Sequence, residues 1–225
     1  MKNTRILIGL ILIVLLLDQW LKFYIKLNFS IGEGFKILGF DWARIHFIEN
    51  EGMAFGILLG GVTGKYVLSI FRILMVGFLI YLLRSMVRTR ESFGLQISFA
   101  LIIAGALGNI LDSAFYGLIF SESGYHSPIP AVLFPEEGGY APFLQGKVVD
   151  MFYFPLIDGY FPDWVPLFGG DRFQFFRPVF NVADSAISVG VALILIFYRS
   201  YFISGDKSKN QETETGSTDS ISEEE

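Results

Sequence analysis

The sequence predicts an α-helical membrane protein with four transmembrane helices, a small extracytoplasmic β-rich region and a long extracytoplasmic loop. Of its 225 residues, 52% are hydrophobic and 24 are phenylalanine, which is too apolar for an ordinary soluble domain. The apolar residues are gathered in blocks, several of them long enough to cross a bilayer. Basic residues cluster beside the ends of these blocks, as they do on the cytoplasmic side of membrane proteins.

Four apolar blocks reach the roughly 20 residues that a transmembrane helix needs, at about 6–26, 66–87, 94–116 and 180–202. Backbone groups in lipid must find partners within their own segment, so all four blocks are expected to be helices. The first block continues past Asp18 without a small-x-small cleavage site, which favours a retained helix over a cleaved signal peptide. We expect residues 1–203 to form one membrane-embedded domain. Residues 204–225, with seven carboxylates, are expected to form a disordered acidic cytoplasmic tail.

Basic residues place both termini on the cytoplasmic side. They precede the first block, separate the second from the third, and follow the fourth: Lys2, Arg5, Arg84, Arg88, Arg90, Arg199, Lys207 and Lys209. In a chain of four spans these groups share one side of the membrane, and an excess of lysine and arginine marks the cytoplasmic side. The two long loops are therefore expected to lie outside.

The two outer loops differ in their residue patterns. Alternation in FKILGF and RIHFIEN predicts short strands in the first loop, about 27–65, and hence a small sheet lying on the membrane. The second loop, between the third and fourth blocks, is rich in proline, glycine and aromatic residues. That composition argues against long helices and favours an interfacial cap.

The residue inventory excludes several kinds of site. There is no cysteine, which rules out disulfides, thiolate catalysis and cysteine-based zinc sites. The two histidines, His46 and His126, form no His-Glu-x-x-His motif, so a zinc peptidase is not expected. We expect no metal and no cofactor. With the acidic tail set aside, nothing in the charge balance indicates nucleic-acid binding.

Polar residues interrupt the first and third blocks at helical spacing. Asp18 and Lys22 are four residues apart; charges within a membrane mark functional sites by default, although these two would also serve as a self-contained ion pair. Asn109 and Asp112 share a helical face, and Gly108 allows a neighbouring helix to approach closely. A purely structural packing motif is the alternative there.

Further polar residues stand at the fourth block and in the loops. The fourth block begins with Asn181 and Asp184, and a carboxylate there also fits simple capping of a helix N-terminus, which is the commoner role for an isolated feature. Asp150 lies among apolar residues in KVVDMFYF. Asn50 opens the motif NEGMAFGI, which by itself also fits a turn leading into a span.

Three of the acids, Asp112, Asp150 and Asp184, are expected at a similar depth near the outer surface, and packing does not explain that grouping. Two carboxylates held close together share a proton, because both cannot ionise cheaply. Such a pair can act as general base and general acid on a peptide bond, with neither metal nor thiol. Spacing alone does not select the pair among these three acids and Asp18.

The motifs DQWLK, NEGMAFG, GALGNILD, VVDMFYF and FNVADSAISVG, in this order between about residues 18 and 195, closely resemble lipoprotein signal peptidase (signal peptidase II). The resemblance implies an intramembrane aspartyl endopeptidase of the bacterial cytoplasmic (inner) membrane. Its substrate would be a diacylglyceryl-modified prolipoprotein, whose signal peptide is cut off before the lipidated cysteine. Membrane lipid is then a further partner, the active site faces the extracytoplasmic side, and a monomer is expected.

The resemblance also implies roles for particular residues. It makes Asp150 and Asp184 the catalytic pair. The residues that match supporting or substrate-binding positions of the family are Asp18, Lys22, Asn50, Gly52, Ala54, Gly108, Asn109, Asp112, Asn181 and Ala183.

The sequence departs from the family pattern in two places. Ser113 stands where the family usually has an arginine, and Arg172 or Arg177 are candidates to replace that charge. The segments at about 119–145 and 156–177 are insertions relative to typical members. Their aromatic residues predict a cap over the site or a docking surface for substrate.

Two functions of other classes fit some of these residues. Polar groups within spans also mark the pathways of small ion or proton-coupled transporters, but that class predicts polar groups through the whole bilayer depth and repeated halves. A catalytically inactive lipoprotein-binding scaffold is the second alternative. The presence of both Asp150 and Asp184 argues against it.

Overall fold

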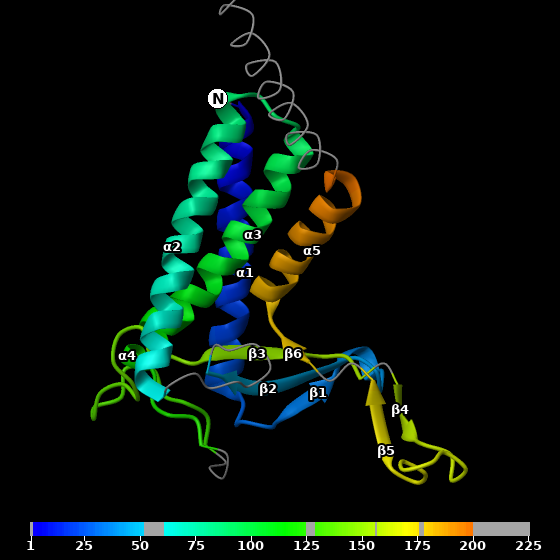
Figure 1. The fold of residues 1–225 in the computed structure, drawn as a ribbon. Helices are drawn as coiled ribbons and strands as arrows, with labels where there is room; N and C mark the ends of the chain where they lie inside the picture. The colour runs from blue at the N-terminus through cyan, green and yellow to red at the C-terminus, as the bar shows by residue number, and fades with distance from the viewer. Residues whose placement is uncertain (1, 52–60, 125–128, 156, 176–177, 200–225) are drawn as a thin grey trace, which may run out of the picture.

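Helices make up one end of the molecule, and strands lie across the other end (Figure 1). The computed structural model describes every residue except 1, 52–60, 125–128, 156, 176–177 and 200–225. Within that part, three helical stretches are long and apolar enough to cross a membrane: Asn3–Asn28, Thr63–Arg88 and Phe93–Ile119. The fourth expected span corresponds to α5 (Val182–Phe197), which is apolar but shorter, with 16 residues.

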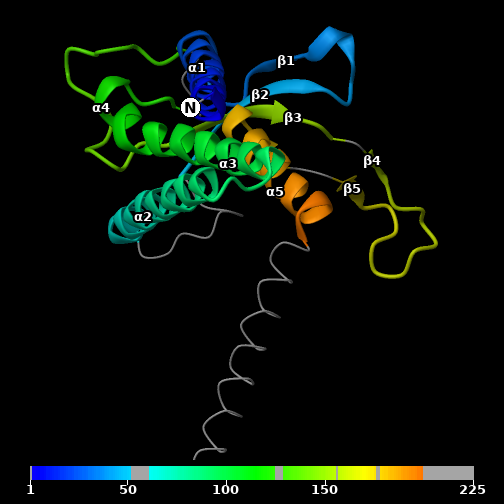
Figure 2. The same ribbon diagram turned by 90° about the horizontal axis from the view of Figure 1, so that it is seen from above.

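Helix α3 (Phe93–Leu111) is the centre of the helical part. It packs against α1 (Lys2–Asn28), α2 (Gly61–Arg88) and α5, and Figure 2 shows it from above between α2 and α5. The outer helices expose large apolar side chains: Leu16 of α1 is 70% exposed and Leu74 of α2 is 67% exposed. Apolar surface of this kind suits contact with lipid rather than with water.

The third span is not a regular α-helix throughout. At Asp112 it passes into a π-helical turn, η3 (Asp112–Tyr116), followed by the short helix α4 (Gly117–Ile119). The expected helix at 94–116 thus has the right extent, but its last turn is wound more widely than the sequence predicts. Such π turns shift the backbone hydrogen bonds and are frequent at functional sites.

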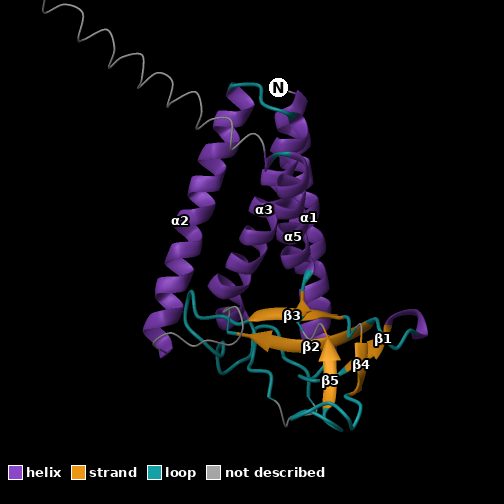
Figure 3. Cartoon of the chain, turned by 45° about the vertical axis from the view of Figure 1, so that its right-hand side comes forward, coloured by secondary structure: helices purple, strands orange, loops and turns teal. Residues whose placement is uncertain are grey.

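The sheet has four antiparallel strands in the order β1-β2-β3-β6, and it lies across the helix ends (Figure 3). Strand β2 (Arg44–Asn50) is the predicted segment RIHFIEN. Of FKILGF, only the start belongs to β1 (Gly34–Lys36), and the chain then forms a 3₁₀ turn, η1 (Ile37–Gly39). Strands β3 (Val148–Tyr153) and β6 (Val179–Phe180) come from the second loop, where no strand was predicted.

The two predicted insertions form different structures. The second contributes β4 (Ile157–Tyr160) and β5 (Arg172–Phe175), a separate two-stranded ribbon that points away from the helices (Figure 1). The described part of the first runs beside α4, where Phe120 and Leu133 form an isolated bridge. Their function as a cap or docking surface stays a prediction.

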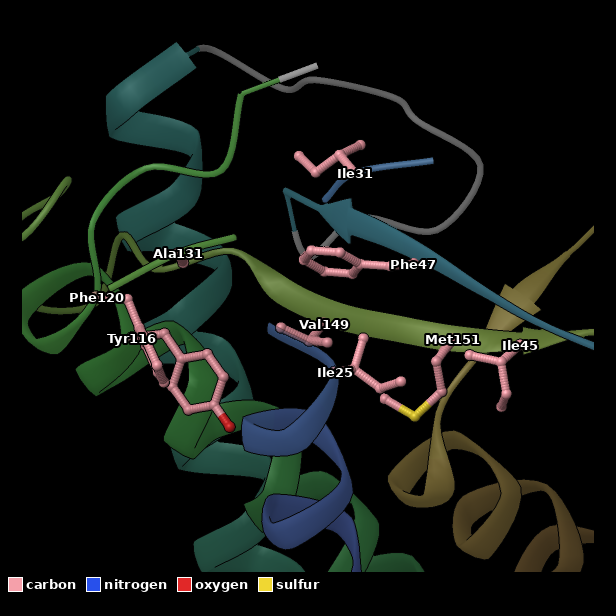
Figure 4. Close-up of a cluster of buried hydrophobic side chains, with 9 residues drawn as sticks. All are labelled: Ile25, Ile31, Ile45, Phe47, Tyr116, Phe120, Ala131, Val149 and Met151. Carbon is pink, nitrogen blue, oxygen red and sulfur yellow. The ribbon is translucent and has the colours of Figure 1, made fainter. Parts of the chain in front are cut away.

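A hydrophobic cluster fixes the sheet to the helices (Figure 4). Ile25 of α1, Phe47 of β2, Val149 and Met151 of β3 and Tyr116 of η3 are all buried in it. Burying large apolar side chains of this kind is the main source of stability in such a core. Because Val149 and Met151 are both held in the cluster, the residue between them, Asp150, has a fixed position.

Candidate active site

Asp150 lies in the middle of β3, opposite Ile48 of β2, and only 3% of it is exposed. Its Oδ1 accepts a hydrogen bond from Nδ2 of Asn181 at 2.7 Å, and its Oδ2 accepts one from Nδ2 of Asn50 at 3.3 Å. Burial, and next the nearby charge of Asp184, raise the pKa of Asp150 to about 7, although both asparagine amides favour the charged form. This carboxyl can therefore hold or release a proton near neutral pH.

Asp184 occupies the first turn of α5, as the third residue after the N-cap Asn181. The two residues form a capping box: the amide N–H of Asp184 donates to Oδ1 of Asn181 at 2.8 Å, and the amide N–H of Asn181 donates to Oδ2 of Asp184 at 3.4 Å. The simple capping alternative is thus partly realised, with Asn181 as the cap. The Asp184 carboxylate has a second partner, because Nδ2 of Asn109 donates to its Oδ1 at 2.8 Å.

Asn181 joins the two carboxylates and is fully buried. Besides its bond to Asp150, its Nδ2 contacts Oδ1 of Asn109 at 3.2 Å and the carbonyl oxygen of Val149 at 3.3 Å. Asn109 in turn accepts a hydrogen bond from Nζ of Lys22 at 3.0 Å. The two asparagines therefore link α1, α3, β3 and the start of α5.

Lys22 lies between two buried carboxylates. Its Nζ is 2.9 Å from Oδ2 of Asp18 and 2.7 Å from Oδ2 of Asp112. The ion pair of Asp18 and Lys22 is therefore present but is not self-contained, since Lys22 also connects α1 to the end of α3. Asp18 makes a further link, because its Oδ1 accepts the amide N–H of Ala183 at 2.8 Å and so holds the start of α5.

Gly108 has a steric reason to be glycine. A Cβ atom there would lie 2.7 Å from Oδ2 of Asp18 and 3.1 Å from Cβ of Ala183. A side chain there would displace the Asp18 carboxylate from its place beside Lys22 and crowd Ala183 of α5. The small residues predicted for the site thus allow the three helices to approach, as small residues do at helix interfaces in membranes.

Gln19 belongs to the site although the sequence analysis did not single it out. Its Nε2 donates to Oδ1 of Asp112 at 2.9 Å and to the carbonyl oxygen of Gly108 at 3.3 Å, and its Oε1 accepts the hydroxyl of Tyr116 at 3.2 Å. It is the neighbour of Asp18 in DQWLK, and its spacing from Lys22 puts both on one face of α1. Only that spacing pointed to it, because an uncharged amide does not stand out.

A second omission is Arg72, a half-buried arginine within α2. The charges of Asp184 and Asp112 act on it, so α2 also brings a cation towards the site. Ser113, which stands at the usual arginine position, is buried and donates to the carbonyl oxygen of Asn109 at 3.1 Å. The side chains of the two predicted replacements, Arg172 and Arg177, lie outside the described part.

The structure thus brings together most of the predicted residues. Gly52 and Ala54 lie outside the described residues, and Asn50 is the last residue of β2. Within the part that the structure describes, no group of three histidine, cysteine or acidic residues is arranged to hold a metal ion. Two carboxylates of different environment, joined by amide side chains, suit proton transfer to and from a peptide bond.

Comparison with known proteins agrees with this arrangement. The sequence model of the family described as "Signal peptidase (SPase) II" matches residues 10–200. Proteins named lipoprotein signal peptidase include one from Porphyromonas gingivalis, 49% identical over 199 residues, which are 88% of this chain and 84% of the relative. Another, from Amoebophilus asiaticus, is 37% identical over 191 residues, 84% of this chain and 75% of the relative.

Two solved structures titled as a bacterial membrane enzyme, determined by the in meso method, share the fold. At 1.9 Å resolution, the identity is 26% and the TM-score 0.53, over 84% of this chain and 90% of the other. At 2.3 Å resolution, the identity is 25% and the TM-score 0.52, over 84% and 85% of the two chains. With its apolar helices and its paired carboxylates, the chain belongs to the signal peptidase II family and is a membrane protease of aspartic type.

Proposed function

We propose that the protein removes the signal peptide from diacylglyceryl-modified bacterial prolipoproteins and cuts the chain before the lipidated cysteine. The observation that carries this proposal is the side chain of Asn181. Its Nδ2 lies 2.7 Å from Oδ1 of Asp150, while its Oδ1 accepts the amide N–H of Asp184 at 2.8 Å. The backbone N–H of Asn181 also donates to Oδ2 of Asp184 at 3.4 Å, so this one residue contacts both carboxylates, as a two-aspartate mechanism requires. The names of the relatives support the lipoprotein substrate.

In the proposed reaction, Asp184 acts as the general base: it takes a proton from water while the water oxygen attacks the carbonyl carbon of the scissile bond. Asp150, protonated in part near neutral pH because its pKa is raised to about 7, donates a proton to the carbonyl oxygen. The C–N bond then breaks, the leaving amine takes the proton that Asp184 holds, and Asp150 recovers its own. Each carboxyl ends in its starting state.

The remaining polar residues support this pair in the proposal. Lys22 and Asn109 hold Asp112 and Asp184 in place, and Asp18 holds the start of α5. Contacts within hydrogen-bond distance join these groups to one another and to Asp150 of the sheet, so they form one cluster, which favours a hydrolytic site over a transport pathway.

The test is cleavage of a diacylglyceryl-modified prolipoprotein by the purified protein, beside Asp150→Asn and Asp184→Asn. Each substitution keeps the side-chain shape but removes a proton-transfer group, and we expect cleavage to fall by about a thousandfold or more. Thermal unfolding shows whether the variants fold. Cleavage by both folded variants would refute the two-aspartate mechanism, and a wild-type protein that binds the substrate without cutting it would favour the scaffold alternative.

A further inference from the structure

The first insertion supplies hydrogen-bond donors to the end of the third span. The last carbonyl groups of any helix lack partners within it, and a π turn displaces further bonds. Here five backbone N–H groups, four from the first insertion and one from Gly146 directly after it, donate to carbonyl oxygens between residues 113 and 120: Gly146 to Ser113 at 2.8 Å, Leu144 to Ala114 at 3.5 Å, Ala141 to Gly117 at 2.9 Å, Phe134 to Ile119 at 2.7 Å and Tyr140 to Phe120 at 3.1 Å. The insertion therefore caps this helix end.

The closest approach is at Gly146. A Cβ atom there would lie 2.2 Å from the carbonyl oxygen of Asp112 and 3.0 Å from the amide nitrogen of Gly117. Both are backbone atoms and cannot move aside cheaply. Gly146 thus lies directly against Asp112, the residue at which the π turn begins. The side chain of Asp112 forms an ion pair with Lys22.

Two hydrogen bonds constrain the backbone between Gly146 and Asp150. The amide N–H of Lys147 donates to the hydroxyl of Tyr140 at 2.7 Å. The amide N–H of Val149 donates to Oδ2 of Asp112 at 3.4 Å. These two bonds tie the insertion and Asp112 to the residues just before Asp150, so the insertion helps to position that residue together with the hydrophobic cluster.

We propose that residues 140–146, the end of the first insertion and the glycine after it, are a positioning element for Asp150: they contact the π turn of the third span and set the depth at which that carboxylate enters the site. This inference rests on the proposed function of Asp150 but concerns how the residue is held. Ser113, the departure from the family pattern, is buried beside Gly146 and accepts its N–H. The departure and the insertion thus occupy the same place in the fold.

The first test is Gly146→Ala, with Gly77→Ala in α2 as the control because a Cβ at Gly77 meets nothing within 4 Å. We expect kcat of Gly146→Ala to fall by about tenfold or more while KM changes by less than about twofold, because displaced catalytic groups slow the reaction without removing substrate contacts. The loss of activity at high pH should also begin at lower pH, as Asp150 becomes less buried. Wild-type kcat and an unchanged pH profile would overturn the proposal.

Tyr140→Phe gives a second test, which decides if Gly146→Ala does not fold. It removes the acceptor of the Lys147 N–H but keeps the ring, and Tyr81→Phe, at a tyrosine of α2 that is 67% exposed, is its control. Infrared spectra, assigned by subtraction of Asp150→Asn, report the titration of the Asp150 carboxyl without any substrate. We expect it to titrate at lower pH in Tyr140→Phe than in wild type.

The two readouts separate the inference from the proposed function. A wild-type protein that does not cleave, with an Asp150 titration that shifts in Tyr140→Phe, would refute the proposed function and leave the positioning element standing. If the wild-type protein is active and both kcat and the Asp150 titration are unchanged in the variants, the positioning element is refuted and the proposed function stands.

Discussion

Two asparagines determine how close the carboxylates of the site can lie. An amide side chain offers both a donor and an acceptor, so Asn181 can contact Asp150 and the backbone of Asp184 at once. Asn109 likewise accepts from Lys22 and donates to Asp184. An aspartate at either position would add a negative charge beside two others, and a leucine would leave buried polar groups unpaired.

Stability should depend on pH through Asp150. Its pKa is raised to about 7 in the folded protein from an ordinary value of 3.8, so the folded state binds the proton more tightly. The resulting stabilisation is fully present below about pH 4 and is lost as pH rises to about 7, with an upper bound of about 4 kcal/mol. Asn has no such proton, so Asp150→Asn should gain stability over wild type between pH 5 and pH 8. Unfolding midpoints in detergent at both values measure this, and a difference that does not vary with pH would contradict it.

Among single residues, the charged ones of the site could be predicted from the sequence. A carboxylate or lysine in an apolar block costs free energy to bury and is therefore conspicuous. Asp18, Lys22 and Asp112 were found in this way. Gln19 was missed because an amide costs less to bury, and Arg72 was missed although it carries the same kind of charge.

Strands β2 and β3 show why one element was predictable and its neighbour was not. In β2, buried and half-buried residues alternate along the whole strand, and the sequence shows that alternation. The first four residues of β3 are all buried, so its sequence VVDMFY has no alternating pattern. The π turn was equally hidden, because its geometry is completed by donors from an insertion many residues away.

A buried ion pair should stabilise the contact between α1, β2 and the first insertion. Nζ of Lys26, at the end of α1, forms an ion pair with Glu49 of β2 and donates to Ser123 of the first insertion at 2.9 Å. Replacing Glu49 by Gln leaves the buried ammonium without its carboxylate, and we expect a loss of about 3–5 kcal/mol of folding stability. Thermal unfolding measures the loss.

The matched control is Asp41→Asn, which breaks the exposed pair of Lys36 and Asp41. Surface pairs contribute little, so its unfolding midpoint should equal that of wild type. Equal midpoints for Glu49→Gln and wild type would show that the buried pair does not hold α1, β2 and the insertion together.

For the whole molecule, the proposal is that α1, α2, α3 and α5 all cross the membrane, with both termini in the cytoplasm and the sheet outside. The basic residues near the helix ends support this orientation. The sheet lies at one end of the helices (Figure 3), and Asp150 of the candidate site is part of its strand β3, so the same orientation puts the site at the outer surface.

The orientation can be tested cleanly because the chain has no cysteine. A membrane-impermeant maleimide should label Asp163→Cys, between β4 and β5, on intact spheroplasts. It should label Ser92→Cys, between α2 and α3, only after permeabilisation. The reverse pattern, or labelling of both on intact spheroplasts, would refute the proposed topology.

The capping of α5 has a consequence for the order of synthesis. The residue that begins this helix also holds Asp150, and Asp18 from the first helix binds the adjoining turn. The last apolar segment to leave the ribosome is therefore the one that brings the two acids together. Under the proposed two-aspartate mechanism, a nascent chain still lacking this segment has no working pair, and activity begins only once α5 has been inserted.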